Sequence, residues 1–430
     1  MNTTPSAPPP FMRDRNFRWL LSGAAISMLG DQFTLIALPW LVLKMTGSTL
    51  VLGTVLALVS VPRALFILVG GAVVDQHSPK SVLMLTKHIN TVLLGLLAAM
   101  VFTDTLNLPM IYAISLAIGV STAFSIPSAT SILPHVVAPE HLKPANGLML
   151  GLRQLSMFLG PLLAGAMIAL FGDGSGGNGI HAGGIGVAFA FDAFSFALSA
   201  WTLSRVTLRA GPAASPGPKQ AVLVSIGEGL AHFWRDVELR ACFIYWALLA
   251  VLIMGPLHIA IPVLAESRPG LGAAALGLIL GAHGAGTLVG MALSGAAPRL
   301  RLGSLGITIL AADLLVGVLF MPMGSISSPW QGVWLMLVIG ALGGFMQVGI
   351  FTWIQRRVPP ALLGRAMSLF MFIFMGLVPV SAAAAGWVMQ WIAPESLFVI
   401  CGAVLVALSA AALMVPAMRR VDDAPVGSAA

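Results

Sequence analysis

Long apolar stretches dominate this sequence, and each is about as long as a helix that crosses a membrane. An α-helix needs about 20 apolar residues to span the hydrocarbon core. Lipid offers no hydrogen bonds, so each stretch is expected to form a helix that satisfies its own backbone groups. We predict twelve spans, at about Arg18–Leu43, Leu50–Val74, Val82–Phe102, Pro109–Leu133, Ala145–Phe171, Ile185–Leu203, Ala241–Leu264, Ala273–Ala297, Leu305–Met323, Gln331–Trp353, Ala366–Trp391 and Leu397–Ala417.

The composition supports an all-α polytopic membrane protein. Of the 430 residues, 58% are hydrophobic and only 9% are charged, whereas soluble domains carry about 25% charged residues. The net charge of +7 does not indicate nucleic acid as a partner, because excess Lys and Arg in membrane proteins normally mark cytoplasmic loops. Cys242 and Cys401 lie in or at apolar helices and give neither a disulfide framework nor metal-ligand spacing.

The distribution of basic residues predicts the orientation of the chain. Most of the 22 lysines and arginines fall at the same alternate ends of the predicted spans, and we count Lys87 among these ends. Lys44 and Arg268 fall on the other side, and Arg63 and Arg153 fall within spans. Because cytoplasmic ends carry the excess of Lys and Arg, both termini are expected in the cytoplasm.

The chain contains an internal repeat. Val137–Ala145 aligns with Val358–Ala366, and the same offset places Gly165 on Gly386. Two similar halves joined head to tail are typical of transporters built from parallel repeats. We therefore expect two pseudo-symmetric six-helix bundles, residues 1–205 and residues 241–430 with a cytoplasmic tail, joined by a cytoplasmic linker at 206–240.

The linker has two parts of different composition. Its first part is rich in Pro, Gly and Ala and is expected to be flexible. The second part has Val222, Ile226, Leu230 and Phe233 at helical spacing. This pattern is typical of an amphipathic helix on the inner membrane surface, although a soluble connector helix has the same pattern.

Charged residues inside the predicted spans are the main candidates for a functional site, because an ionisable group in the hydrocarbon region is expensive. Asp31 lies near the middle of the first span and Arg63 near the middle of the second. These neighbouring spans are antiparallel, so the two side chains can meet. They then form either a fixed structural ion pair or a site at which Asp31 carries a proton or another cation. In the second case Arg63 adjusts the pKa of Asp31. Arg153 either extends toward the nearer membrane surface or faces a cavity.

Other polar residues in the spans are weaker candidates. Asp192, in the sixth span, is the next candidate for proton coupling, and a packing or hydrogen-bonding role explains it equally well. A structural role is favoured for Asp313. Gln347 is a candidate for lining the substrate cavity. We interpret His258 and His283 as satisfied interior groups and not as ligands.

Three motifs give the chain a resemblance to a known family. The first is the loop Gly71-Ala-Val-Val-Asp75-Gln-His-Ser-Pro-Lys80. The second consists of Gly151, eight intervening residues, and then Gly160-Pro161-Leu-Leu-Ala164-Gly165. The third is Gln355-Arg-Arg-Val-Pro-Pro-Ala-Leu-Leu-Gly-Arg365. With them the chain resembles the major facilitator superfamily over nearly its whole length, and within it the drug-efflux branch of macrolide and enterobactin exporters. Gln76, Ser78, Pro79 and Ala164 depart from the family patterns.

The resemblance implies a conformational gate formed by the motif residues. Asp75 would pair with cations or a helix N-terminus of the other half and hold the inner side shut. A solvated loop charge is the alternative for Asp75. The residues that the resemblance assigns to the gate are Gly71, Asp75, Lys80, Gly151, Gly160, Pro161, Gly165, Arg356, Arg357, Gly364 and Arg365.

The expected function is secondary active transport in the bacterial inner membrane. The resemblance implies proton-coupled export of a small, largely apolar compound, drug-like, macrolide-like or siderophore-like, by alternating access. A lipid or lysophospholipid mover of the same fold is the alternative, and a non-transporting scaffold is the weakest interpretation. The sequence has no paired-histidine metal motif, nucleophile elbow or phosphate loop. We therefore expect that the protein is not an enzyme and that it binds no metal or cofactor. The expected partners are the small-molecule substrate, protons or another cation, and membrane lipid.

Overall fold

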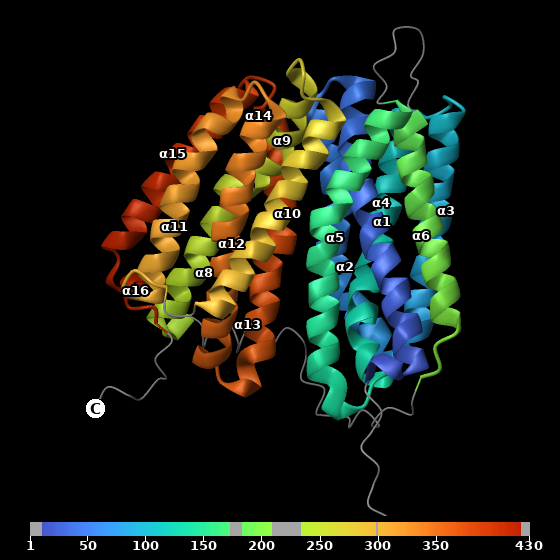
Figure 1. The fold of residues 1–430 in the computed structure, drawn as a ribbon, viewed down its shortest axis with the longest axis horizontal. Coiled ribbons are helices and arrows are strands. Elements are labelled where there is room, and N and C mark those ends of the chain that lie inside the picture. The colour runs from blue at the N-terminus through green and yellow to red at the C-terminus, as the bar shows by residue number, and fades with distance from the viewer. Residues whose placement is uncertain (1–10, 173–182, 209–233, 298–299, 423–430) are drawn as a thin grey trace, which may run out of the picture.

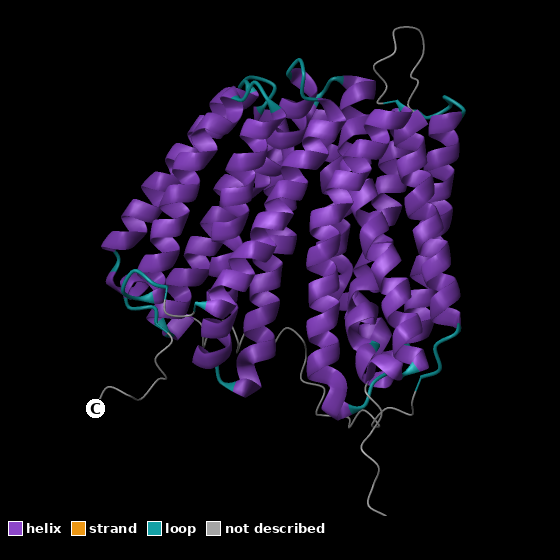
Figure 2. Ribbon diagram, in the orientation of Figure 1, coloured by secondary structure: helices purple, strands orange, loops and turns teal. Residues whose placement is uncertain are grey.

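The computed structural model describes residues 11–172, 183–208, 234–297 and 300–422. Within these ranges the chain is helical, and Figure 2 shows helices joined by short loops. This confirms the prediction of an all-α membrane protein. The predicted amphipathic helix of the linker lies largely outside the described residues.

Twelve helical segments of the described chain are long and apolar enough to cross a membrane. They agree with the predicted spans to within several residues, although the seventh and eleventh spans are each divided into two helices. The bounds are α1 (Arg15–Thr46), α2 (Thr49–Gln76), α3 (Pro79–Phe102), α4 (Leu108–Ser131), α5 (Leu142–Phe171), α6 (Gly183–Ser204), α8 (Val237–Leu249) with α9 (Gly255–Ser267), α10 (Gly272–Ala296), α11 (Leu305–Phe320), α12 (Pro329–Arg357), α13 (Pro360–Phe372) with α14 (Val378–Val388), and α15 (Pro394–Met414), followed by the short α16 (Pro416–Arg419).

Local sequence explains where several helices begin and end. Side-chain oxygens of Asp14, Ser48 and Asn107 accept hydrogen bonds from the first-turn amides of α1, α2 and α4. These caps satisfy amide groups that have no partner within the helix. At the other end of α1, Gly47 has φ +59°, a left-handed conformation that glycine adopts at little cost.

A π-helical turn separates α8 from α9 at Ala250–Met254, and another separates α13 from α14 at Ile373–Leu377. Such turns disturb the backbone hydrogen-bond ladder, and in a membrane neighbouring helices must satisfy the displaced groups. Here the Ser381 hydroxyl donates to the Val251 carbonyl, and the Cys401 thiol lies 3.6 Å from the Leu252 carbonyl.

The helices form two bundles, α1–α6 and α8–α15, which stand side by side in Figure 1. Equivalent pairs of helices pack in both bundles: α3 packs on α6 as α11 packs on α15, and α2 packs on α4 as α10 packs on α12. The two pairs that join the bundles, α5 with α10 and α2 with α14, are also equivalent. This arrangement confirms two pseudo-symmetric bundles, while the exact boundaries at 205 and 240 remain predictions.

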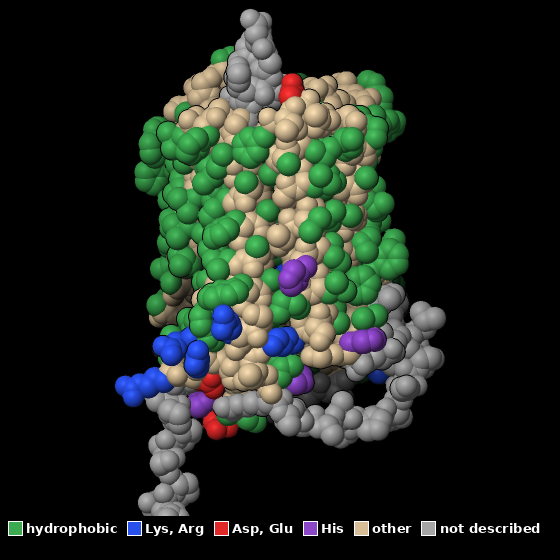
Figure 3. All heavy atoms as spheres, turned by 90° about the vertical axis from the view of Figure 1, so that its right-hand side faces the viewer, with side chains coloured by type: hydrophobic (Ala, Val, Ile, Leu, Met, Phe, Trp, Pro, Cys, Tyr) green, Lys and Arg blue, Asp and Glu red, His purple; other side chains and the backbone are tan. Residues whose placement is uncertain are grey.

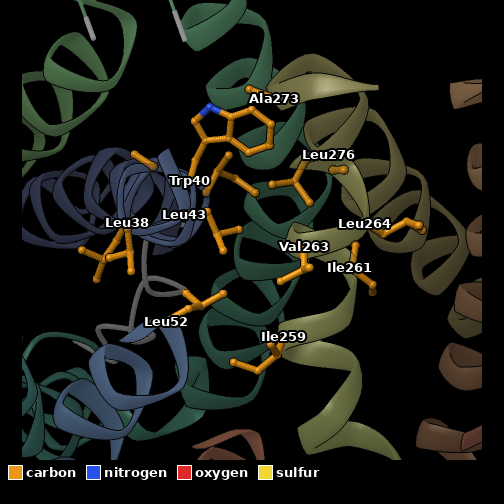
Figure 4. Packing of buried hydrophobic residues seen from close by; sticks show 14 of the residues in the cluster. Leu38, Trp40, Leu43, Leu52, Ile259, Ile261, Val263, Leu264, Ala273 and Leu276 are labelled. Carbon is orange, nitrogen blue, oxygen red and sulfur yellow. The ribbon is translucent and has the colours of Figure 1, made fainter. Parts of the chain in front are cut away.

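We call the end of the molecule where α1 begins and α15 ends the terminal face, and the other end the opposite face (Figure 1). Near the opposite face a shared apolar core joins the bundles. Figure 4 shows Trp40, Leu43 and Leu52 close to Ile259 and Val263 of the other bundle. These side chains exclude water from this end of the interface.

Glycines allow the two bundles to approach closely in the same region. A Cβ on Gly165 of α5 would lie 2.6 Å from the Ala273 carbonyl oxygen of α10, and one on Gly53 of α2 would lie 3.0 Å from the Ala383 carbonyl oxygen of α14. Packing of small residues is the usual way for helices to associate in lipid. At the rim, the Lys44 ammonium lies 3.6 Å from the Glu266 carboxylate.

The outer surface matches a membrane. Figure 3 shows hydrophobic side chains over the middle of the α1–α6 bundle, with most charged side chains near the end where α1 begins. Leu65, Val92 and Leu170 are among the large apolar side chains exposed on this bundle. Exposed apolar surface of this extent is stable in contact with lipid chains.

We predict that Gly165→Leu opens the interface at the opposite face, because its side chain collides with the α10 backbone. Cysteines placed at Lys44 and Glu266 should be joined readily by a short bifunctional thiol cross-linker in the parent protein, and at least several-fold less in the Gly165→Leu background. The two native cysteines are buried and should not compete. Gly147→Leu, on the same helix with no atom within 4 Å of the added Cβ, is the matched control. Equal cross-linking in all three proteins would show that the glycine contact does not hold this face closed.

Candidate functional site

Asp31 occupies an unusual environment on α1. Its side chain is exposed, although Asp31 lies in the middle of a helix that is long and apolar enough to cross a membrane. The carboxylate is attracted most strongly by Lys87, and then by Arg63 and Arg153. The structure therefore brings Asp31 together with the two intramembrane arginines predicted from the sequence.

Arg63 and Asp31 do not form an ion pair, since the described ion pairs include neither side chain. Among the described residues, the guanidinium of Arg63 lies within hydrogen-bond distance of the Ser60 hydroxyl alone, at 3.5 Å, and its Nε atom has no partner there. Arg153 on α5 is exposed. The fixed-pair alternative is thus not realised in this structure, and the cationic groups retain donors for another ligand.

The second bundle contributes polar groups to the same region. His258 on α9 is exposed, and it experiences the charge of Arg63, which belongs to the other bundle. His283 on α10 lies close enough to His258 for their charges to interact, and its Nδ1 atom has no hydrogen-bond partner. Within the described part of the structure the Nδ1 atom is unpaired, and the interpretation of His283 as an interior group and not a ligand stays a prediction. Gln347 is an exposed residue of α12.

Lys87 lies in the interior of the first bundle, and its predicted place at a cytoplasmic span end is wrong. We assigned it to a cytoplasmic span end, but it sits inside α3 with only 7% of its surface exposed. Its ammonium lies 3.2 Å from the Ser27 hydroxyl of α1 and 5.4 Å from the centre of the Phe196 ring of α6. Because Lys87 lies close to the end of the span, its position in the sequence does not indicate that its side chain is buried.

Asp192 of α6 is held by hydroxyl groups beside Lys87. The hydroxyls of Thr34 and Ser195 both donate to its carboxylate, and the side chain is 1% exposed. Gly30 of α1 permits this contact, since a Cβ there would overlap Asp192 and Ser195. Asp192 is therefore sealed within the bundle, while Asp31 is exposed, and both interact electrostatically with Lys87.

The second bundle contains a similar buried carboxylate. The Tyr245 hydroxyl lies 2.7 Å from the Asp313 carboxylate and 3.0 Å from the Ser409 hydroxyl. These residues come from α8, α11 and α15, the counterparts of α1, α3 and α6. The contacts agree with the structural role predicted for Asp313.

The fifth-span motif lies on the surface of α5 that meets other helices. A Cβ on Gly160 would overlap the Gln32 side chain of α1, and Gly277 of α10 packs against the Pro161 carbonyl oxygen and the Gly165 backbone. Gly151 has no atom near its Cβ position. Gly160, Pro161 and Gly165 therefore allow close packing, and their role in gating remains a prediction.

Basic motif residues at the terminal face make contacts within their own bundles. The Lys80 ammonium lies 2.6 Å from the Val206 carbonyl oxygen just after α6. The Arg357 guanidinium lies 2.9 Å from the Asp236 carboxylate and 3.2 Å from that of Glu238 at the start of α8. Burial by itself raises the pKa of Asp236, but hydrogen bonds from Arg357 and from the Leu239 and Glu238 amides hold that pKa below its ordinary value.

Several predicted gate residues fall where side chains are not described. Gly71 and Asp75 lie on α2 and Gly364 lies on α13, but the surroundings of their side chains lie outside the described part of the structure. The roles of Gly71, Asp75, Gly364 and Arg365 remain predictions. In the described ranges no group of three or more His, Cys, Asp or Glu residues could hold a metal ion.

Comparisons with known proteins agree with this architecture. The family model described as Major Facilitator Superfamily matches residues 20–380. The multidrug efflux pump Tap of Mycolicibacterium fortuitum is 26% identical over 94% of this chain and 96% of its own length. Macrolide efflux protein A of Streptococcus pyogenes is 20% identical over 94% and 97%. A bacterial homologue of the iron transporter ferroportin, solved in an inward-facing state, superposes with a TM-score of 0.68 at 17% identity over 94% of this chain and 99% of that one.

We predict that Lys87→Met destabilises the protein by about 2 kcal/mol, because a buried carboxylate loses its nearby cation. Asp192→Asn in the Lys87→Met background should recover part of this loss, since it removes the uncompensated charge. Thermal and denaturant unfolding in detergent would measure both effects. Lys143→Met is the control, because Lys143 is exposed on α5. Unchanged stability of Lys87→Met, or additive losses in the double variant, would contradict this electrostatic coupling.

Proposed function

The chain belongs to the major facilitator superfamily, and from that premise we propose that it exports a small, largely apolar compound across the bacterial inner membrane in exchange for protons. The observation that carries the proposal is the exposed side chain of Asp31 in the middle of a membrane span, within the electrostatic reach of Arg63 and Arg153. Holding a charge at this depth is costly, so it points to a functional role.

The way the bundles meet supports the proposal of transport by alternating access. The apolar and glycine-rich contacts run from the middle of the spans to the opposite face. Rocking the bundles about their centre would separate these contacts and bring the terminal ends together. We assign the terminal face to the cytoplasm and the gate to the motif residues there, including Asp75 and Arg365. The structure then corresponds to an inward-facing state.

The direction of transport is inferred from relatives. Both named relatives are efflux proteins, and the comparisons do not favour the lipid-moving alternative. An apolar substrate is supported by an aromatic row in the second bundle. The Phe370 ring centre lies 5.2 Å from that of Phe351 and 4.7 Å from that of Phe374, and Phe351 follows Gln347 by one helical turn of α12.

Proton coupling requires Asp31 to bind protons differently in the two states. Rocking changes its access to water and the distance to charges of the second bundle, whereas Lys87 in its own bundle stays close. A proton that binds one state more tightly shifts the equilibrium toward that state. Proton flow into the cell then drives substrate outward.

The proposed orientation predicts which residues a membrane-impermeant thiol reagent can reach in intact cells. Ser81→Cys, at the terminal face, should be protected until the membrane is permeabilised. Ser327→Cys, at the opposite face, should react at once. Both serines are exposed, so a difference in labelling reports sidedness and not burial. The reverse pattern would contradict cytoplasmic termini.

We predict that Asp31→Asn separates exchange from uphill transport, because it preserves the size of the side chain and removes its titration. In proteoliposomes the variant should still exchange substrate for substrate but lose export driven by a pH gradient by at least tenfold. Asp104→Asn, an exposed loop residue, is the control. Full gradient-driven export by Asp31→Asn would show that the coupling site is not Asp31, and Asp192 would be the next residue to test.

A further inference from the structure

A cavity unrelated to the space between the bundles lies at the terminal end of the second bundle. It has a volume of about 320 Å³ and is formed by α10, α11 and α12. Its polar lining consists of Arg301, Arg356, Ser294, Thr308 and Thr352, and none of its lining residues is acidic. A cavity of this size with two guanidinium groups suits one phosphate group with its immediate substituents.

Arg356 is the most available cation of this cavity. It is exposed and has no hydrogen bond or ion pair in the described part of the structure, whereas its neighbour Arg357 is bound to Asp236 and Glu238. Arg301 lies 3.6 Å from the Asp422 carboxylate. A guanidinium donates several hydrogen bonds in a fixed plane, a geometry that matches the oxygens of a phosphate.

The start of α11 adds to the positive potential of the cavity. Leu305 and Thr308 of its first turn line the cavity. The N-terminal end of a helix carries a partial positive charge that favours anions. This contribution and the two arginines all favour a negative ligand.

The surroundings of the cavity identify the source of the phosphate. Leu293, beside Ser294, is 47% exposed, and Leu300 and Leu302, on either side of Arg301, are 62% and 64% exposed. Apolar side chains exposed beside paired arginines suit the boundary between acyl chains and headgroups. Basic pockets between membrane helices near the cytoplasmic side bind anionic lipid headgroups. We propose that this cavity binds the phosphate of an anionic glycerophospholipid, with Arg356 as its principal ligand.

The test uses the full-length protein in nanodiscs of phosphatidylcholine with a minor fraction of phosphatidylglycerol. Native mass spectrometry should show phosphatidylglycerol retained in preference to phosphatidylcholine. Arg356→Gln should weaken this retention about fivefold, as expected for one arginine at an anionic surface. Arg419→Gln is the matched control, because Arg419 is exposed at the same face and does not line the cavity.

A second variant and a competitor make the result decisive. Thr352→Leu narrows the cavity without disturbing other helices, because the Thr352 hydroxyl bonds only to Val348 of its own helix; it should also reduce retention. Equal retention by the parent, Arg356→Gln and Thr352→Leu would overturn the proposal. Displacement of the lipid by millimolar inorganic phosphate would also overturn it, since the cavity would then be a site for free phosphate. Because the readout is lipid binding, a failure here leaves the export proposal unaffected.

Discussion

An unpaired charge in the hydrocarbon core costs several kcal/mol, and this cost explains where the chain places its ionisable groups. Lys87 and Asp192 are buried among hydroxyl groups inside the first bundle, and Asp313 is buried against Tyr245 in the second. Asp31 is instead exposed in the middle of a span, and we propose that it lines the space between the bundles. The bundles have to remain separable around that space for Asp31 to act in transport.

The contact between the bundles near the opposite face has to exclude water and still be able to open, and close helix packing allows both. Lipid provides little hydrophobic drive for helices to associate, so contact depends on how closely their backbones fit. Gly53 and Gly165 provide this fit where the bundles meet, and the core around Trp40 completes the seal. Because few polar contacts join the bundles there, separating them exposes mostly apolar groups and breaks few hydrogen bonds. Equivalent helices of the two halves make these contacts, as expected from the internal repeat.

The sequence alone was sufficient to predict the fold, because span length and charge density depend only on composition along the chain. It also identified Asp31, Arg63 and Arg153 as a group, since charges are rare in spans. It could not place Lys87, because a basic residue near a span end is normally a surface residue. The pairing of Asp192 with Thr34, and the approach of His258 to Arg63, depend on helix rotation and on contacts between bundles. Hydrophobic spacing does not define either of these.

The central claim is that the space around Asp31 opens to one membrane face at a time. Alkylation of His258→Cys by membrane-impermeant thiol reagents, applied to oriented vesicles from each side in turn, tests it most directly. The account predicts reaction from the terminal face only in the parent background, and reaction from the opposite face once Gly165→Leu is added. Reaction from both faces in the parent background, or from neither face in either background, would contradict alternating access to this site.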